Sequence, residues 1–190
     1  MKSFLRLLVV LPLLILIIVV VMGALGDSDK PLKKLPRLTL GEDARDFTYP
    51  DLQGRPVTLS SFFGDKVVFI NIWATWCTEC RKELPTVQKM YEKFKGDDLE
   101  VLAVSIDAAG AKAIVPFMEE LGLKFPALQD TSGSIQLLYG TTGVPETFII
   151  DKKGKVAYVE IGAGDWREHE KQALIKGLMD EPDVPREVAK

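Results

Sequence analysis

Residues 66–85 read KVVFINIWATWCTECRKELP, and this stretch decides the fold. Its first part, Lys66 to Ala74, is a nearly continuous apolar run, which is typical of a strand covered on both faces. Apolar residues then recur at helical spacing, namely Leu84, Val87, Met90, Tyr91 and Phe94. We therefore expect a helix from about Thr78 to Lys95. Cys77 and Cys80 lie at the junction between the strand and the helix.

The position of this CxxC pair indicates redox chemistry. At the amino terminus of a helix, unpaired N–H groups and the positive end of the helix dipole stabilise a thiolate. Cys77 is therefore the predicted nucleophile, and Cys80, one turn further along the same face, is placed to resolve a mixed disulfide. The alternative is a static disulfide. A loop this short removes little chain entropy, so such a disulfide would stabilise the fold only weakly.

Composition narrows the class of protein further. The chain has 190 residues, with 24 basic and 27 acidic side chains and a net charge of −3, which disfavours binding to nucleic acid. One histidine and two cysteines fall short of a closed zinc site unless carboxylates complete it. Haem attachment needs a histidine directly after the CxxC motif, where this chain has Arg81. We expect no metal and no cofactor beyond the Cys77–Cys80 dithiol.

The amino terminus predicts a membrane anchor. Leu7 to Gly26 contains no charged side chain, and a helix of this length covers about 30 Å, the thickness of a bilayer core. Residues 1–26 are thus the predicted transmembrane segment, with a cleaved signal ending near Gly26 as the alternative. Lys2 and Arg6 precede the run and favour a cytoplasmic amino terminus. We expect a single-pass protein of the cytoplasmic (inner) membrane, with its folded domain on the periplasmic or extracytoplasmic side, where conditions are oxidising.

The rest of the chain predicts a linker at 27–45, a folded domain at 46–180 and a disordered tail at 181–190. Strands and helices alternate within the domain: a hairpin from Phe47–Tyr49 and Pro56–Leu59, a buried strand at Leu99–Ile106, helices at Gly110–Gly122 and near Ser134–Tyr139, a hairpin from Glu146–Asp151 and Val156–Ile161, and a final helix at Trp166–Leu178. This order favours an α/β fold with a mixed central sheet flanked by helices.

Two segments resemble a known family. Residues 71–85 resemble the active-site segment of thioredoxin-like proteins of the TlpA/ResA/DsbE type, within the AhpC/TSA-redoxin superfamily, and residues 143–151 resemble the cis-proline loop of that family. Residues 117–126 are similar to its central strand-and-helix insertion. The resemblance implies a thioredoxin-like fold and a membrane-anchored reductase of protein disulfides, including those of apocytochrome c, which receives electrons from a membrane thiol reductant. We expect this protein to be a monomer.

The resemblance also implies roles for residues around the dithiol. Val144–Pro145 is expected to be a cis peptide that faces the cysteines, with the backbone of Val144 pairing with a client strand. Asn71 stands where thioredoxin has a buried acid. Glu83 matches the acid of the ResA-like pattern and is a candidate to take the proton from Cys80, the alternative being a solvated helix carboxylate.

Further residues near the motifs have weaker assignments. Glu146 is a second candidate acid, whose negative charge beside the sulfurs would oppose thiolate formation. We expect Trp76 to shield the sulfurs and to contact clients, and Trp73 to lie in the core. Pro85 is predicted to be structural within the helix, and His169 to be a surface or packing residue.

Two other functions remain open at this point. Peroxiredoxins share the fold, but they carry proline seven residues and threonine three residues before the reactive cysteine, where this chain has Ile70 and Ala74. The second is a binding module or chaperone that uses the fold without turnover. The direction of electron flow and the client protein do not follow from the sequence.

Overall fold

A computed structural model describes residues 34–96, 98–183 and 185. The predicted anchor at 1–26, the first part of the predicted linker and the last five residues of the predicted tail lie outside the described residues. Within the described ranges, no helix is both long enough and apolar enough to cross a bilayer.

A five-stranded mixed sheet forms the centre of the fold, with the strand order β5-β4-β3-β6-β7. β3 (Val67–Trp73) runs parallel to β4 (Leu99–Ser105), and β4 runs parallel to β5 (Ala127–Gln129). β6 (Glu146–Ile150) pairs antiparallel with β3 and with β7 (Val156–Ile161). The mixed sheet predicted from the alternation of strands and helices is confirmed.

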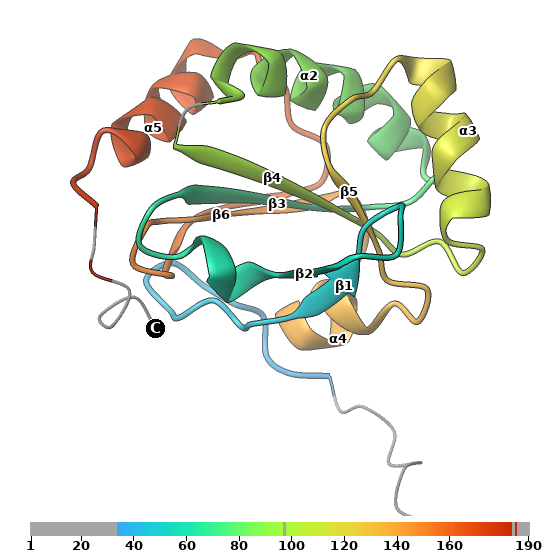
Figure 1. Cartoon of the computed structure of the whole chain (residues 1–190), viewed down its shortest axis with the longest axis horizontal. Coiled ribbons are helices and arrows are strands. Elements are labelled where there is room, and N and C mark those ends of the chain that lie inside the picture. Colours follow the sequence, from blue (N-terminus) through green and yellow to red (C-terminus); the bar gives the residue numbers. More distant parts are fainter. Residues whose placement is uncertain (1–33, 97, 184, 186–190) are drawn as a thin grey trace, which may run out of the picture. The chain divides into compact units, whose positions relative to one another are not determined.

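Helices cover both faces of this sheet (Figure 1). α2 (Thr78–Phe94), α3 (Ala111–Leu121) and α5 (His169–Met179) lie over one face, and α4 (Ser134–Tyr139) lies over the other. Every residue of β3 is buried, as expected for a strand covered on both sides.

The predicted amino-terminal hairpin is also present, on the side of α4 (Figure 1). β1 (Thr48–Pro50) pairs antiparallel with β2 (Pro56–Thr58), and the 3-10 helix η2 (Leu59–Phe62) follows. The hydroxyl groups of Tyr49 and Ser134 share a hydrogen bond of 2.9 Å. This bond ties the hairpin to the start of α4.

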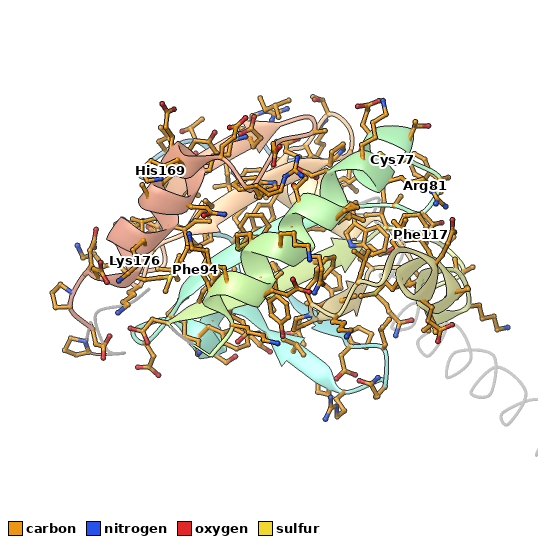
Figure 2. All side chains as sticks on the ribbon, turned by 90° about the horizontal axis from the view of Figure 1, so that it is seen from above. Cys77, Arg81, Phe94, Phe117, His169 and Lys176 are labelled. Atoms are coloured by element: carbon orange, nitrogen blue, oxygen red, sulfur yellow. A yellow bond between two sulfur atoms is a disulfide. The ribbon has the colours of Figure 1, made fainter. Side chains whose placement is uncertain are left out.

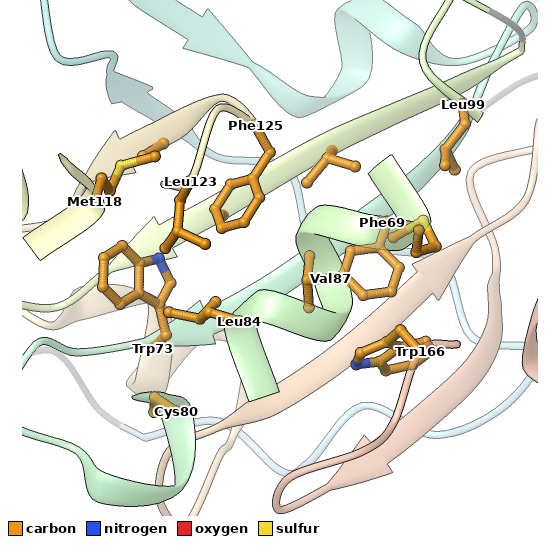
Figure 3. Packing of buried hydrophobic residues seen from close by; sticks show 14 of the residues in the cluster. Phe69, Trp73, Cys80, Leu84, Val87, Leu99, Met118, Leu123, Phe125 and Trp166 are labelled. Atoms are coloured by element: carbon orange, nitrogen blue, oxygen red, sulfur yellow. The ribbon is translucent and has the colours of Figure 1, made fainter. Parts of the chain in front are cut away.

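Alternation along β3 sorts its side chains between the two faces. Phe69 and Trp73 pack in the cluster beneath α2 and α5, which Figure 3 shows, whereas Ile70 and Ile72 pack in the cluster on the side of α4. Neighbouring residues on β3, and likewise on β6, therefore serve opposite faces of the sheet. This alternation decides which side chains meet the cysteines.

The last helix begins later than the apolar spacing predicted. α5 starts at His169, and Trp166 lies in the preceding loop with its side chain fully buried. The backbone N–H of Trp166 donates to the hydroxyl of Thr86 on α2 over 3.1 Å, so it is engaged outside the helix. Trp166 is buried like the apolar residues of the helix and continues their spacing, but its backbone is not helical.

The folded unit begins earlier than the domain start that we expected at residue 46. Residues from Lys34 onward belong to it. In the segment assigned to the linker, Leu38 is buried, and its N–H donates to the carbonyl of Tyr139 over 3.2 Å. The N–H of Leu35 donates to the carbonyl of Leu137 over 2.9 Å. We call residues 34–46 the amino-terminal strap.

The first residues of the predicted tail are also in contact with the domain. The amine of Lys152 is buried, and it donates to carboxylates of Asp98 and Asp183 and to the backbone carbonyl of Glu181, at 2.8 to 2.9 Å. A buried ammonium needs such partners, so Lys152 fixes residues 181–183 against the domain.

Candidate active site

The two cysteines lie where the sequence predicted, at the amino terminus of α2. Cys77 is the N-cap residue of the helix, and its Sγ accepts from the backbone N–H of Cys80 over 3.0 Å. The two sulfurs form a disulfide, with 5.2 Å between the Cα atoms. Figure 2 shows Cys77 at one end of α2 and Phe94 at the other. An N–H donor and the helix dipole therefore point at Sγ of Cys77, the arrangement that stabilises a thiolate there.

The two sulfurs differ in access. Cys77 is 8% exposed and Cys80 is 0% exposed. A client sulfur must therefore approach Cys77 first. Cys80 remains behind it and can reach only a sulfur that is already attached to Cys77.

The proline loop faces Cys77, as the resemblance implied. The Val144–Pro145 peptide is cis. The carbonyl oxygen of Val144 lies 3.5 Å from Sγ of Cys77, and Val144 packs against the core cluster that contains both cysteines. In the reduced protein this carbonyl is placed to accept a hydrogen bond from the thiol of Cys77.

Glu83 is buried on the cysteine-bearing face of the sheet rather than solvated. Its side chain is 1% exposed, and its carboxylate accepts from Nδ2 of Asn71 at 3.1 Å, the N–H of Gly164 at 3.0 Å and Nε1 of Trp166 at 2.9 Å. Burial raises the pKa of Glu83, and these three donors oppose the rise. A buried acid with a raised pKa on the same helix as Cys80 fits the predicted role of proton acceptor.

Glu146 differs from the hypothesis made for it. It pairs with Ile72 in the register of β6 with β3, so its side chain faces the side of α4, opposite to Glu83. It forms an ion pair with Arg37 of the amino-terminal strap. Burial raises the pKa of Glu146, and Arg37 opposes the rise. Glu146 therefore does not place an unpaired charge beside the sulfurs. Its position directly after Pro145 suggested that it would, but side chains alternate between the two faces along β6.

Burial agrees with the core assignment of Trp73 and with the surface assignment of His169. Trp76, directly before Cys77, is 68% exposed, whereas Trp73 is fully buried. His169 is exposed at the start of α5, away from Cys77 (Figure 2). Pro85 lies inside α2, which continues through it. In the part of the chain that the structure describes, no group of three or more histidine, cysteine or acidic side chains is arranged to hold a metal ion.

Comparison with known proteins assigns the family. The family model described as the AhpC/TSA family matches residues 40–159. The chain belongs to this family. The matched residues include β3, the dithiol, the insertion and the proline loop, whereas Gly164 and Trp166, which donate to Glu83, lie beyond them.

Relatives within the AhpC/TSA family agree with the TlpA/ResA/DsbE-like resemblance. The thiol-disulfide oxidoreductase ResA of Bacillus cereus is 35% identical over 144 residues, which are 75% of this chain and 82% of the relative. ResA of Bacillus subtilis is 37% identical over 122 residues, 64% of this chain and 67% of the relative. A solved structure from Chlorobium tepidum, described as a putative thiol:disulfide interchange protein DsbE, is 32% identical with a TM-score of 0.68, covering 75% of this chain and 99% of that one.

Sequence reasoning missed one acid that supports the dithiol loop in this AhpC/TSA member. The carboxylate of Asp107 accepts from the N–H of Thr75 at 2.9 Å, the hydroxyl of Thr75 at 2.6 Å and the hydroxyl of Ser105 at 2.7 Å. Thr75 lies two residues before Cys77. Asp107 follows β4, which is parallel to β3, so the shared carboxyl edge of these strands was the signal that could have found it.

A second missed residue joins the insertion to the dithiol helix. Arg81, directly after Cys80, forms a two-point ion pair with Glu120 of α3, at 2.6 and 3.0 Å, and its guanidinium lies 4.8 Å from the ring centre of Phe117. In the sequence alone, Arg81 only excludes haem attachment. No local pattern links it to a helix some 39 residues away.

Proposed function

We propose that this protein reduces disulfide bonds in exported proteins. It is a thiol–disulfide oxidoreductase of the ResA and DsbE type. The observation that carries the proposal is the Cys77–Cys80 disulfide at the amino terminus of α2, with Cys77 open to the cis-proline loop and Cys80 enclosed. This asymmetry suits a site that engages one client sulfur at a time.

The reaction is a pair of thiol–disulfide exchanges. The thiolate of Cys77 attacks one sulfur of the client disulfide, so that a mixed disulfide forms and the other client sulfur leaves as a thiolate. Cys80 then loses its proton and attacks Sγ of Cys77, which closes the Cys77–Cys80 disulfide and releases the second client thiolate. We assign Glu83 as the acceptor of the Cys80 proton. A dithiol donor must afterwards reduce Cys77–Cys80, because each cycle consumes two electrons.

The client is recognised by its extended backbone. We propose that the backbone of Val144 pairs with a client strand beside the disulfide, and that the exposed indole of Trp76 covers the apolar residues of that strand. Apocytochrome c before haem attachment is the client class that the family resemblance suggests. The proposal further includes the single-pass anchor at 1–26, an extracytoplasmic domain and a membrane thiol reductant as electron donor.

Two measurements test the proposed function: the rate of insulin reduction and the reduction potential of the Cys77–Cys80 pair. The reduced protein should accelerate the reduction of insulin by dithiothreitol, whereas a binding module would leave that rate unchanged. Equilibration with glutathione or dithiothreitol couples gives the reduction potential. A potential near about −120 mV, the range of strong exported oxidants, would reverse the assignment as a reductase.

Location and clients need separate experiments. Carbonate extraction of membranes should leave the full-length chain in the pellet, and protease added to intact spheroplasts should digest the domain. C80A should trap clients as mixed disulfides, with C77A as the matched control that traps none. Recovery of the domain in the cytoplasmic fraction would contradict the predicted location.

A further inference from the structure

A residue outside the thioredoxin-like core brackets the cis-proline loop. Nη1 of Arg37 pairs with the carboxylate of Glu146, and its Nη2 donates to the hydroxyl of Thr142 over 2.9 Å. Thr142 and Glu146 are the two ends of the segment that holds Val144 and Pro145. One guanidinium therefore joins both ends of the loop that lies 3.5 Å from Sγ of Cys77. The two terminal nitrogens of a planar guanidinium reach both ends at once, whereas a lysine would offer its donors from one nitrogen on a shorter side chain.

The backbone of the strap holds Arg37 in this position. Its neighbours Leu35 and Leu38 donate to carbonyl groups at the end of α4, and Leu38 is buried. The backbone of Arg37 passes so close to Gly140 that a Cβ at position 140 would lie 2.5 Å from N of Arg37. Only glycine allows this approach, since the φ of Gly140 is also +69°. The guanidinium is thus presented to the loop from a fixed backbone.

Loss of the ion pair between Arg37 and Glu146 would leave a buried negative charge without its main partner. Its side chain is buried, and Oε2 has no hydrogen-bond partner within the described ranges. The groups that face it are Arg37, the backbone N–H of Thr142 and, at longer range, Lys34. Without Arg37 a buried carboxylate keeps a single short-range donor, and such a group either moves toward water or takes up a proton. Either change disturbs the residue directly after Pro145.

We propose that Arg37 is a positioning residue for the cis-proline loop, which holds the backbone of Val144 in place to receive protein disulfides. This inference rests on the proposed function, because it concerns how clients dock at the same dithiol. It gives Arg37, a residue of the strap, a role in client docking. A change of strap conformation would then alter client recognition without any change at Cys77 or Cys80.

The test compares a protein disulfide with a small one, using full-length protein. R37M should raise the KM for insulin about tenfold while kcat changes little, because a displaced loop weakens client docking and leaves the dithiol intact. Its rate with the small aromatic disulfide DTNB should not change, because that substrate needs no strand pairing. R37K should behave like R37M, because lysine has one donor nitrogen on a shorter side chain and lacks the second nitrogen that reaches Thr142. T142V removes one end of the bridge and should give a smaller increase in KM.

The matched control removes another ion pair of the strap. Asp43 pairs with Lys155 over 2.7 Å, and both side chains are exposed. D43N should leave the KM for insulin unchanged. An unchanged KM in R37M, full rescue by R37K, or an equal loss with insulin and DTNB would each overturn the proposal.

Hydrogen exchange separates this inference from the proposed function. In the oxidised protein, R37M should speed the exchange of the Thr141 and Thr142 amides, which donate to Gln136 and Glu146, and leave that of β3 unchanged. If the native protein reduced no disulfide, the proposed function would fail, and exchange would still decide whether Arg37 holds the loop. Unchanged exchange at both amides would refute that role.

Discussion

Nδ2 of Asn71 donates to the carboxylate of Glu83 over 3.1 Å, and both side chains are buried on the face of the sheet that carries the cysteines. The same nitrogen donates to the hydroxyl of Thr147 at 2.8 Å. Asn71 stands on the strand position where thioredoxin has its acid, so in this protein the strand supplies a donor and helix α2 supplies the carboxylate. Asn71 and Glu83 together therefore keep one buried acid beneath the dithiol helix, although it comes from the helix and not from the strand.

This relationship predicts a specific pH dependence of stability. The folded protein raises the pKa of Glu83 above its ordinary value of 4.5, chiefly through burial. The folded state therefore keeps the proton of Glu83 to a higher pH than the unfolded chain does. Its contribution to the free energy of unfolding is fully present below pH 4.5 and is lost as pH rises through the raised pKa. E83Q should lack this loss, as urea unfolding at a series of pH values would detect.

The control for this experiment is a variant of Glu120, whose pKa is shifted in the opposite direction from that of Glu83. Arg81 lowers the pKa of the exposed Glu120. The contribution of Glu120 is thus present above pH 4.5 and is lost as pH falls, so E120Q should change the profile in the opposite sense. If E83Q and the native protein lost stability in parallel from pH 4.5 upward, Glu83 would not titrate as a buried acid.

Two buried tryptophans offer a matched test of the donors around Glu83. Nε1 of Trp166 donates to Glu83 at 2.9 Å, whereas Nε1 of Trp73 is buried with no partner in the described part of the chain. W166F and W73F remove similar volumes, but only W166F removes a hydrogen bond to a carboxylate. W166F should cost about 1–3 kcal/mol more than W73F in the free energy of unfolding. It should also raise the pKa of Glu83 further, which carbon-13 NMR of the carboxyl group would measure.

Equal losses of stability in the two variants would show that packing alone matters at both positions. An unchanged carboxyl titration in W166F would show that the indole N–H does not stabilise ionised Glu83. Either result would leave Asn71 and Gly164 as the donors that set the pKa of this acid.

The sequence was sufficient for the parts of the site that depend on local structure. A continuous apolar run located β3, helical spacing of apolar residues located α2, and the CxxC motif at their junction located the helix amino terminus that activates Cys77. The proline loop and Glu83 required the family resemblance, because neither has a local signal of its own. Burial of Glu83 depends on Trp166 and Gly164, which come from a loop 81 to 83 residues later.

The missed features depend on contacts across the fold. Arg37 and Glu146 are 109 residues apart, and no periodicity in a charged strap indicates that one of its cations reaches the active-site loop. The face of Glu146 followed from the register of β6 with β3, which fixes alternate side chains on opposite sides. Trp166 was misassigned to a helix because helical spacing records burial and not backbone conformation.

Asp107 should be important for the loop that carries the cysteines. Its buried carboxylate accepts three hydrogen bonds, two of them from Thr75. D107N replaces one oxygen with a donor that faces other donors, so it should lower the free energy of unfolding by about 1–3 kcal/mol. T75V removes only the hydroxyl and should cost less. Denaturant unfolding gives both values, and a D107N variant as stable as the native protein would remove this role.

The difference in access between the two sulfurs predicts their order of reaction. In the disulfide form, the N–H of Cys80 lies 3.0 Å from Sγ of Cys77, and Cys77 is partly open to solvent, whereas Cys80 is fully buried. C80A, which retains Cys77, should react with iodoacetamide at neutral pH at least about tenfold faster than C77A, which retains Cys80, because the thiolate is the nucleophile. The rate for C80A should follow a pKa below the ordinary thiol value of about 8.5. Mass spectrometry of alkylated protein at several pH values measures both quantities.

Equal rates in the two variants, or a pKa of Cys77 at the ordinary value, would mean that the helix terminus does not activate this sulfur. The reaction order proposed for the dithiol would then be wrong.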